Sequence, residues 1–220
     1  MKDLGPVNKI LGMQIYRDRN NMTIWLSQKN YLKKILRRFN MHDCKPISSP
    51  LPVNFNLSSS MCPSNEATRK EMSRVLYASA MGSLMFAMIC TRPDIAQAVG
   101  AVSRYMANPG GEHWIAVKRI LKYIKGTSNV TLCYGGSEFT VRGYVDSDFV
   151  GDFDKRKSTT GYVFTCGSSC KLGFKTADYC GSIYNRNRVH VSYTNLQGSY
   201  LDTKVIEGVR AQTTENSYIL

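Results

Sequence analysis

Four aspartates lie close together in the second half of the chain: Asp146, Asp148 and Asp152 in the stretch VDSDFVGD, and Asp154 two residues later. Neighbouring carboxylates repel one another unless water, a cation or a hydrogen-bond donor lies between them. Two interpretations are open. One is a polar turn after a strand, where aspartate is common; the other is part of a metal site for phosphodiester chemistry. The spacing alone favours the turn.

The positive charge of the chain is concentrated before residue 127. The formal net charge is +13, and residues 1–126 carry 19 Lys and Arg against 7 Asp and Glu, whereas residues 127–167 carry 4 against 5. The first part is therefore the candidate for weak, salt-dependent binding of a polyanion. An ordinary solvated helix surface explains these cations equally well. The candidate phosphate-binding residues lie on two predicted helices: Lys33, Lys34, Arg37, Lys118, Arg119 and Lys122.

The cysteines and the apolar segments indicate in which compartment the chain is located and whether it crosses a membrane. The seven cysteines include no C-x-x-C pair, and the three histidines are scattered, so no zinc site is predicted. Free thiols indicate a reducing compartment, which predicts a cytoplasmic location, with the nucleus as an alternative. No signal peptide is recognised. The apolar stretch LMFAMIC is too short to cross a bilayer, so no membrane partner is expected.

The first 66 residues predict a hairpin, a helix and a linker. Residues 8–26 show two apolar runs around the polar turn RDRNN. Ser27 is the predicted cap of a helix that continues to about Phe39. Residues 42–66 are rich in proline and serine and have no periodicity, so they are predicted to be a linker. The predicted inner face of the helix is Leu32, Ile35, Leu36 and Phe39.

A block of helices is predicted next, followed by strands. Residues 67–89 are apolar nearly all round and predict one buried helix. Thr91 and Asp94 resemble a capping box around Pro93. After Gly126 the pattern changes to strands, and Asp146 is predicted to stand at the end of the central one. The predicted core positions of the later helices are Ile95, Ala98, Val99, Val102 and Met106, then Trp114, Val117, Leu121 and Ile124 of a helix over residues 112–125.

Five stretches resemble the Pol polyprotein of copia-type retrotransposons, in the order of that family. They are KILGMQIYRD, LSQKNYLKKILRRFNM, YASAMGSLMFAMICTRPDI, AVSRYMANPGGEHWIAVKRILKYIKGT and GYVDSDFVGDFDKRKSTTGYVFT. The resemblance implies the C-terminal part of a reverse transcriptase followed by the start of ribonuclease H, with an α+β fold. The implied segments are 1–41 (end of the palm), 42–66 (linker), 67–126 (helical thumb or connection), 127–167 (truncated ribonuclease H-like sheet) and a tail, 168–220.

The catalytic motifs of that family are mostly missing from this chain. The Tyr-Val-Asp-Asp turn of the polymerase site does not occur, and it is expected to lie upstream of Met1. The ribonuclease H site of the family needs four carboxylates around two Mg²⁺ ions. By resemblance, Asp146 matches the first of these catalytic and metal-binding aspartates. Asp148 is a neighbour on the same side of the strand. The later motifs cannot be read in residues 168–220, so tight metal binding is not expected.

The tail suggests a one-base shift of the reading frame near residues 167–169. Back-translation of residues 169–176, started one base later, permits AVSWVSK, and later stretches permit LSTTETEYM and TCKEAIWIQKLL, the motifs of the family in order. A tail read out of frame has no selected fold, so we expect it to be disordered. A divergent domain is the alternative.

Three functions remain open from the sequence. The favoured one is an inactive fragment of a reverse transcriptase and ribonuclease H polyprotein. The second is a non-catalytic, sequence-independent module that binds RNA–DNA hybrid or duplex nucleic acid weakly. A working nuclease ranks last, because it would need carboxylates from another chain. The oligomeric state does not follow from the sequence.

Overall fold

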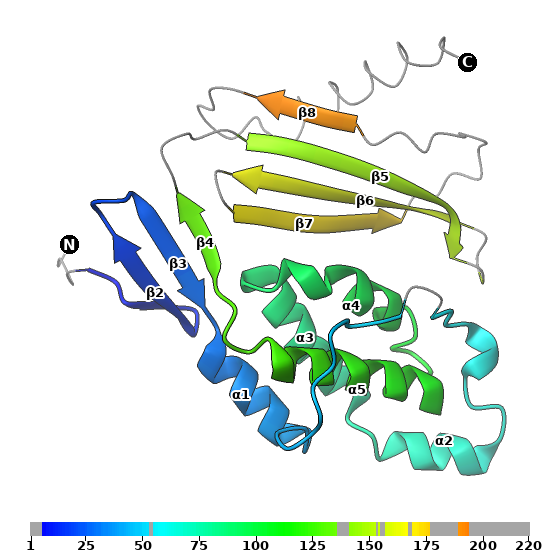
Figure 1. Cartoon of the computed structure of the whole chain (residues 1–220). Helices are drawn as coiled ribbons and strands as arrows, with labels where there is room; N and C mark the ends of the chain where they lie inside the picture. Colours follow the sequence, from blue (N-terminus) through cyan, green and yellow to red (C-terminus); the bar gives the residue numbers. More distant parts are fainter. Residues whose placement is uncertain are drawn as a thin grey trace, which may run out of the picture. The chain divides into compact units, whose positions relative to one another are not determined.

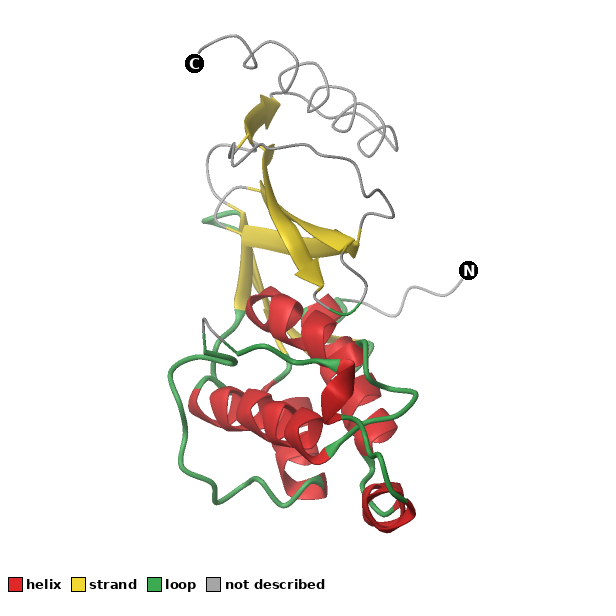
Figure 2. Cartoon of the chain, turned by 90° about the vertical axis from the view of Figure 1, so that its right-hand side faces the viewer, coloured by secondary structure: helices red, strands yellow, loops and turns green. Residues whose placement is uncertain are grey.

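A computed structural model describes residues 6–52, 55–135, 141–152, 154, 157–166, 169–176 and 189–193 (Figure 1). The chain divides into two compact units. The first comprises Met1–Tyr16 and Trp25–Leu132 and holds the helices; the second comprises Arg17–Ile24 and Cys133–Leu220 (Figure 2).

The N-terminal strands contain the predicted hairpin. β1 (Lys9–Ile10), β2 (Met13–Asp18), β3 (Thr23–Ser27) and β4 (Leu132–Gly135) form a sheet in the order β1-β2-β3-β4. The Asp18 carboxylate closes the turn between β2 and β3. It accepts the backbone N–H groups of Asn20 and Asn21 at 3.0 and 3.1 Å, as aspartate commonly does in turns.

Helix α1 (Lys29–Arg38) is amphipathic, as predicted. Its buried face is Leu32, Ile35 and Leu36. Gln28 occupies the N-cap position in place of the predicted Ser27. Ser27 Oγ still accepts the Lys29 N–H, at 3.4 Å.

The prediction of a single helix over residues 67–89 is wrong. The structure has α2 (Glu66–Ser73) and α3 (Tyr77–Cys90), bent by 50° at the break between them. The reason is the sequence of α2, EATRKEMS, which has charged residues around the helix and buries none of its side chains. Among the described residues no single helix is long and apolar enough to cross a membrane. α2 and α3 together have that length and composition, but only as a bent pair.

The later helices bury most of the predicted core positions. The 3₁₀ helix η2 (Pro93–Ile95) leads into α4 (Ala96–Ser103), and α5 (Gly111–Gly126) follows. Met106 is 40% exposed, because α4 ends at Ser103 and the helical spacing of apolar residues does not continue to position 106. Trp114 is half-buried beside the core. Those confirmed as buried are Ile95, Ala98, Val99, Val102, Val117, Leu121 and Ile124.

One hydrophobic core joins α1, α3, α4 and α5. Leu51, Phe55 and Leu57, from the predicted linker, pack against this core, and the 3₁₀ helix η1 (Ser59–Met61) follows them. The predicted segment limits at residues 41 and 66 therefore do not coincide with a border between compact units.

The second unit contains an antiparallel sheet in the order β7-β6-β5-β8. Its strands are β5 (Val141–Asp152), β6 (Lys157–Cys166), β7 (Ser169–Thr176) and β8 (Val189–Tyr193). β7 and β8 lie in the tail that was expected to have no selected fold. β7 pairs with β6 from Thr159↔Thr176 to Cys166↔Ser169, and such backbone pairing does not require particular side chains. The other tail residues lie outside the described ones, and the frame shift stays a prediction.

Candidate nucleic-acid interface

The cations of α1 form an exposed surface, called here the α1 surface: Lys29, Lys33, Lys34, Arg37 and Arg38. The helix sequence KNYLKKILRR contains no acidic residue. Within the described part of the chain, none of the five has an ion-pair partner. Because residues four apart rise about 6 Å along one side of a helix, Lys29, Lys33 and Arg37 form a row. This arrangement is suited to contacting successive phosphates of a nucleic-acid backbone.

The α1 surface is held rigidly from behind. Leu32, Ile35 and Leu36 are buried in the helical core. Tyr31 packs edge-on against Phe86 of α3, with ring centroids 5.0 Å apart, and its hydroxyl donates to the Ser83 carbonyl at 3.3 Å. The exposed cations therefore project from a fixed helix.

The predicted cations of α5 are less accessible than expected. Lys118, Arg119 and Lys122 are half-buried. Lys118 Nζ lies 5.8 Å from the centre of the Trp114 ring. Arg119 Nε is buried and has no hydrogen-bond partner among the described residues. Lys118 therefore covers part of the Trp114 ring, as long cationic side chains often cover apolar surface.

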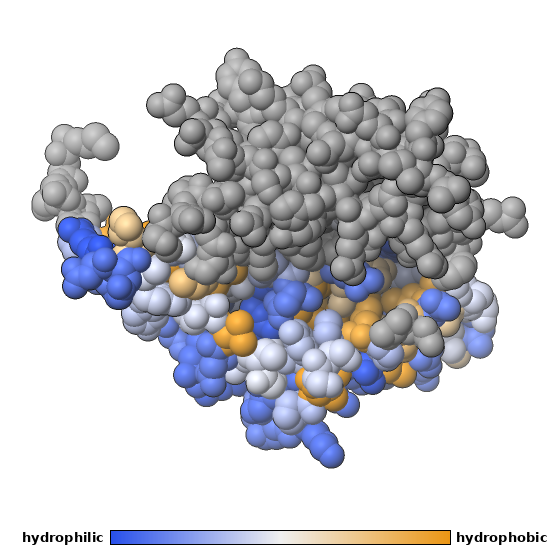
Figure 3. Space-filling view, turned by 45° about the horizontal axis from the view of Figure 1, so that its top comes forward, coloured by the Kyte–Doolittle hydropathy of each residue, from blue (hydrophilic) through white to orange (hydrophobic). Residues whose placement is uncertain are grey.

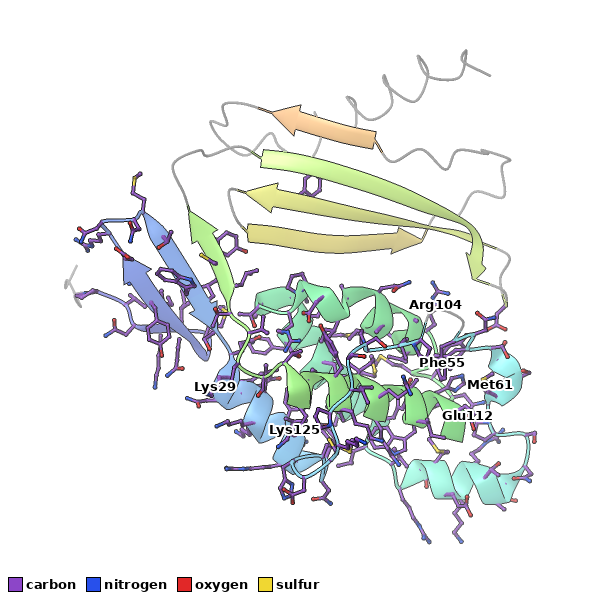
Figure 4. The ribbon with its side chains drawn as sticks, in the orientation of Figure 1. Lys29, Phe55, Met61, Arg104, Glu112 and Lys125 are labelled. Carbon is purple, nitrogen blue, oxygen red and sulfur yellow. The ribbon has the colours of Figure 1, made fainter. Side chains whose placement is uncertain are left out.

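The two helices meet at an aromatic contact. The rings of Phe39, just after α1, and Trp114 of α5 lie edge to face, with centroids 6.4 Å apart. Arg38 stands 5.8 Å from the centre of the Phe39 ring. Cations from both helices thus flank one aromatic pair, but the α1 cations are the freer ones. Figure 4 labels Lys29 on α1 and Lys125 near the end of α5.

Asp146 lies within the central strand β5, not at its end. It pairs with Gly161 of β6, and Asp148 pairs with Thr159; pairing with β8 stops at Val145. The strand continues to Asp152, past a register irregularity. The β5 side chains lie outside the described ones, so the geometry of the predicted metal site stays untested. Among the described residues no group of three or more His, Cys, Asp or Glu is placed to hold a metal.

A buried polar network was missed by the sequence analysis. Arg92 has 0% of its surface exposed. Its Nε and Nη2 donate to the two carboxylate oxygens of Asp94, at 2.9 and 2.7 Å, and Nη1 donates to the Thr127 carbonyl at 3.1 Å. The Tyr123 hydroxyl donates to Asp94 Oδ2 at 2.7 Å. The network fastens the start of α4 to the end of α5.

This network replaces the predicted capping box, which is not formed. Asp94 is occupied by Arg92, and the Thr91 hydroxyl donates to Gln28 Oε1 at 2.6 Å, away from the helix backbone. The spacing of Arg92 and Asp94 around Pro93 is the sequence signal that could have suggested the pair.

Comparisons with curated proteins place the chain in a family. It is 55% identical over 165 residues to the retrovirus-related Pol polyprotein from transposon TNT 1-94 of Nicotiana tabacum. The aligned region covers 75% of this chain and 12% of that protein. It is 33% identical over 168 residues to the retrovirus-related Pol polyprotein from transposon RE1 of Arabidopsis thaliana, and this alignment covers 76% of this chain and 11% of that protein. An uncharacterized mitochondrial protein of Arabidopsis thaliana is 39% identical over 168 residues, and this alignment covers 76% of this chain and 66% of that protein.

The chain belongs to the retrovirus-related Pol polyproteins of transposons. It spans 12% of the tobacco polyprotein. No family model matches the chain, and no solved structure does.

Proposed function

We propose that this chain is a non-catalytic part of a copia-type Pol polyprotein that binds nucleic-acid backbones through the α1 surface. It corresponds to the C-terminal part of the reverse transcriptase and the start of ribonuclease H. The observation that carries the binding proposal is the α1 surface, which has five exposed cations without an ion-pair partner in the described part of the chain.

The chemistry of such a surface indicates its ligand. Cations on one side of a helix neutralise phosphates and release counterions, so binding is insensitive to sequence and falls steeply with salt. RNA–DNA hybrid and duplex DNA should therefore bind with similar, weak affinity. Catalysis is not part of the proposal, because Asp146 and its neighbour supply only part of the oxygen ligands that Mg²⁺ requires.

The test measures the salt dependence of binding by the full chain. Fluorescence anisotropy with a labelled hybrid and a labelled DNA duplex would be recorded from 50 to 200 mM salt, a range of roughly fourfold over which phosphate contacts weaken strongly. The variant Lys33→Ala, Lys34→Ala, Arg37→Ala should bind less tightly. The slope of log K against log salt should fall in magnitude by about 2 to 3 if three phosphate contacts are lost.

A matched control separates the surface from the net charge. Arg69→Ala, Lys70→Ala, Arg74→Ala removes the same charge from exposed positions on and just after α2, and it should leave the slope nearly unchanged. Equal losses in both variants would show that only net charge matters. No loss in the α1 variant would show that its cations are an ordinary solvated surface.

A third variant compares the two helices. Lys118→Ala, Arg119→Ala, Lys122→Ala should change the slope less than the α1 variant does, because these α5 side chains are half-buried. A larger change from the α5 variant than from the α1 variant would assign the interface to α5.

A further inference from the structure

Residues 44–51, in the segment that follows α1, are held by apolar contacts alone. Within the described part of the chain, no hydrogen bond reaches their backbone or their side chains. Cys44 and Leu51 pack against the helical core, and Pro46 would lie 3.1 Å from a Cβ atom on Gly126, the last residue of α5. Local detachment of such a segment costs little, because few contacts and no hydrogen bonds are lost.

Ser49 is exposed between these points of attachment, as is its neighbour Ser48. Both lie in irregular backbone, outside any helix or strand. Ser49 precedes Pro50, and a residue before proline is biased towards extended conformations. Neither serine hydroxyl has a hydrogen-bond partner among the described residues. The Ser49 hydroxyl is therefore free to react.

Serines in the helices differ from Ser49 in both respects. The hydroxyls of Ser73, Ser83 and Ser103 each donate to a backbone carbonyl of their own helix, at 2.7, 2.8 and 2.8 Å. An enzyme that binds its substrate as an extended segment would have to unwind these helices first. Ser49 presents no such obstacle.

The sequence around Ser49 indicates the class of enzyme. Ser49 is the only serine or threonine in the 220-residue chain that directly precedes a proline. Proline has a fixed φ and no backbone N–H, and proline-directed protein kinases accept a serine or threonine that is followed at once by proline. Exposure and sequence context therefore select the same residue, and the context excludes Ser48.

Cations lie near this position. The Ile47 carbonyl would lie 3.7 Å from a Cβ atom on the last residue of α5, and Ser49 follows two residues later, within about 7 Å of chain. Lys125 stands at that end of α5 (Figure 4), and Lys45 is exposed four residues before Ser49. In sequence, the nearest carboxylate is Asp43, six residues away. A phosphate, with a charge of about −1.5 to −2 at pH 7, would thus have cations close by.

We propose that Ser49 is a phosphorylation site for a proline-directed protein kinase. The base of the kinase accepts the hydroxyl proton while the Ser49 oxygen attacks the γ-phosphorus of Mg-ATP. The bond from that phosphorus to ADP breaks, ADP leaves, and the proton passes to solvent. The site is independent of the nucleic-acid proposal, since it rests on exposure, backbone conformation and sequence context.

Incubation of the full chain with Mg-ATP and a purified cyclin-dependent kinase tests the site, with mass spectrometry of the peptides to locate the phosphate. The phosphate is expected on Ser49. Ser49→Ala should abolish its incorporation, whereas Ser48→Ala, a change at an equally exposed serine without a following proline, should preserve it. No incorporation into the wild type, incorporation that persists in Ser49→Ala, or equal loss in both variants would overturn the proposal.

A peptide of residues 43–52 shows whether the fold leaves the site open. Because no hydrogen bond has to break, kcat/KM for the folded chain should lie within about tenfold of the value for the peptide. Circular dichroism before and after the reaction should show the same helical signal. A larger deficit of the chain, or phosphorylation only after denaturation by urea, would show that the packing closes the site and would overturn the proposal.

Discussion

Gly110 stands where the segment between α1 and α2 leaves no room for a side chain. A Cβ atom at this position would overlap the carbonyl oxygen of Met61 and lie 3.4 Å from the Cα of Cys62. A Cβ atom on the next residue, Gly111, would meet nothing within 4 Å apart from its chain neighbours and its own helix backbone. Two adjacent glycines in the stretch NPGG therefore have different roles: one permits a close backbone approach, and the other begins α5.

Substitution of these glycines should separate the two roles. Gly110→Ala should lower the free energy of unfolding by about 2 kcal/mol or more, because the backbone at Met61 must shift to avoid overlap. Gly111→Ala should be neutral or stabilising by up to about 1 kcal/mol, since alanine is the better helix former. Urea unfolding followed by circular dichroism measures both. Similar effects of the two substitutions would show that Met61 does not pack on Gly110 as described.

Individual residues were predictable from the sequence where periodicity decides their place. Leu32, Ile35 and Leu36 follow helical spacing and are buried as expected. Arg92 and His113 were not recognised, because polar residues are buried only when distant partners satisfy them. The partners of Arg92 include Thr127, and those of His113 include Ser58, which are 35 and 55 positions away. No local pattern reveals these distant partners, although the spacing of Arg92 and Asp94 indicates the nearer partner of Arg92.

At the scale of elements, the Arg92 network fastens the corner between α3 and α4 to the end of α5. Burial alone would raise the pKa of Asp94, but the hydrogen bonds and charge of Arg92 outweigh it, so the pKa is lowered. A lowered pKa in the folded state contributes stability above the unfolded value of 3.8. That contribution is lost as the pH falls through the folded pKa.

Asp94→Asn should test this contribution. The substitution leaves the buried Arg92 without its counterion and should cost about 3 kcal/mol, toward the lower end for a buried pair, since the Asp94 side chain is 35% exposed. The difference in unfolding free energy between wild type and variant should be constant from pH 7 to 5 and shrink below about pH 4. A difference that does not shrink in acid would exclude the ion pair as its source.

Helices were predicted well where one side is clearly apolar, and poorly where polarity changes along the chain. α1 and α5 have sharp apolar and cationic sides, and their limits match the prediction within a residue or two. The break between α2 and α3 contains neither proline nor glycine. It arises because α2 has no apolar side to bury, whereas α3 does. The segment between α1 and α2 has no periodicity, and its path is set by tertiary contacts alone.

At the scale of the whole molecule, several apolar side chains remain on the surface. Ile89 and Leu11 are 74% and 73% exposed, and orange apolar surface interrupts the hydrophilic surface in Figure 3. Single exposed apolar residues are ordinary in soluble proteins. The chain also spans only 12% of the tobacco polyprotein, so its surface alone does not define what the polyprotein does.

The ribonuclease H activity that the sequence resemblance implies would need residues beyond β5. Two-metal hydrolysis of a phosphodiester needs ions held about 4 Å apart by shared carboxylates. β5 supplies Asp146 and Asp148, two positions apart on one strand, and the motifs with the remaining carboxylates are not readable in residues 168–220. One strand cannot fix both ions, because each hard cation needs about six oxygen ligands.

We therefore expect no cleavage of RNA in an RNA–DNA hybrid by the purified chain in Mg²⁺ or Mn²⁺, and no primer extension. Labelled hybrid on a denaturing gel measures the first, and a primed template measures the second. Restoring the reading frame by one base near codon 168 should supply the missing carboxylates and bring back hybrid cleavage. Asp146→Asn should then abolish that cleavage, while leaving binding of the hybrid by the α1 surface unchanged. Cleavage by the unaltered chain that disappears in Asp146→Asn would show that the site is complete without the restored frame.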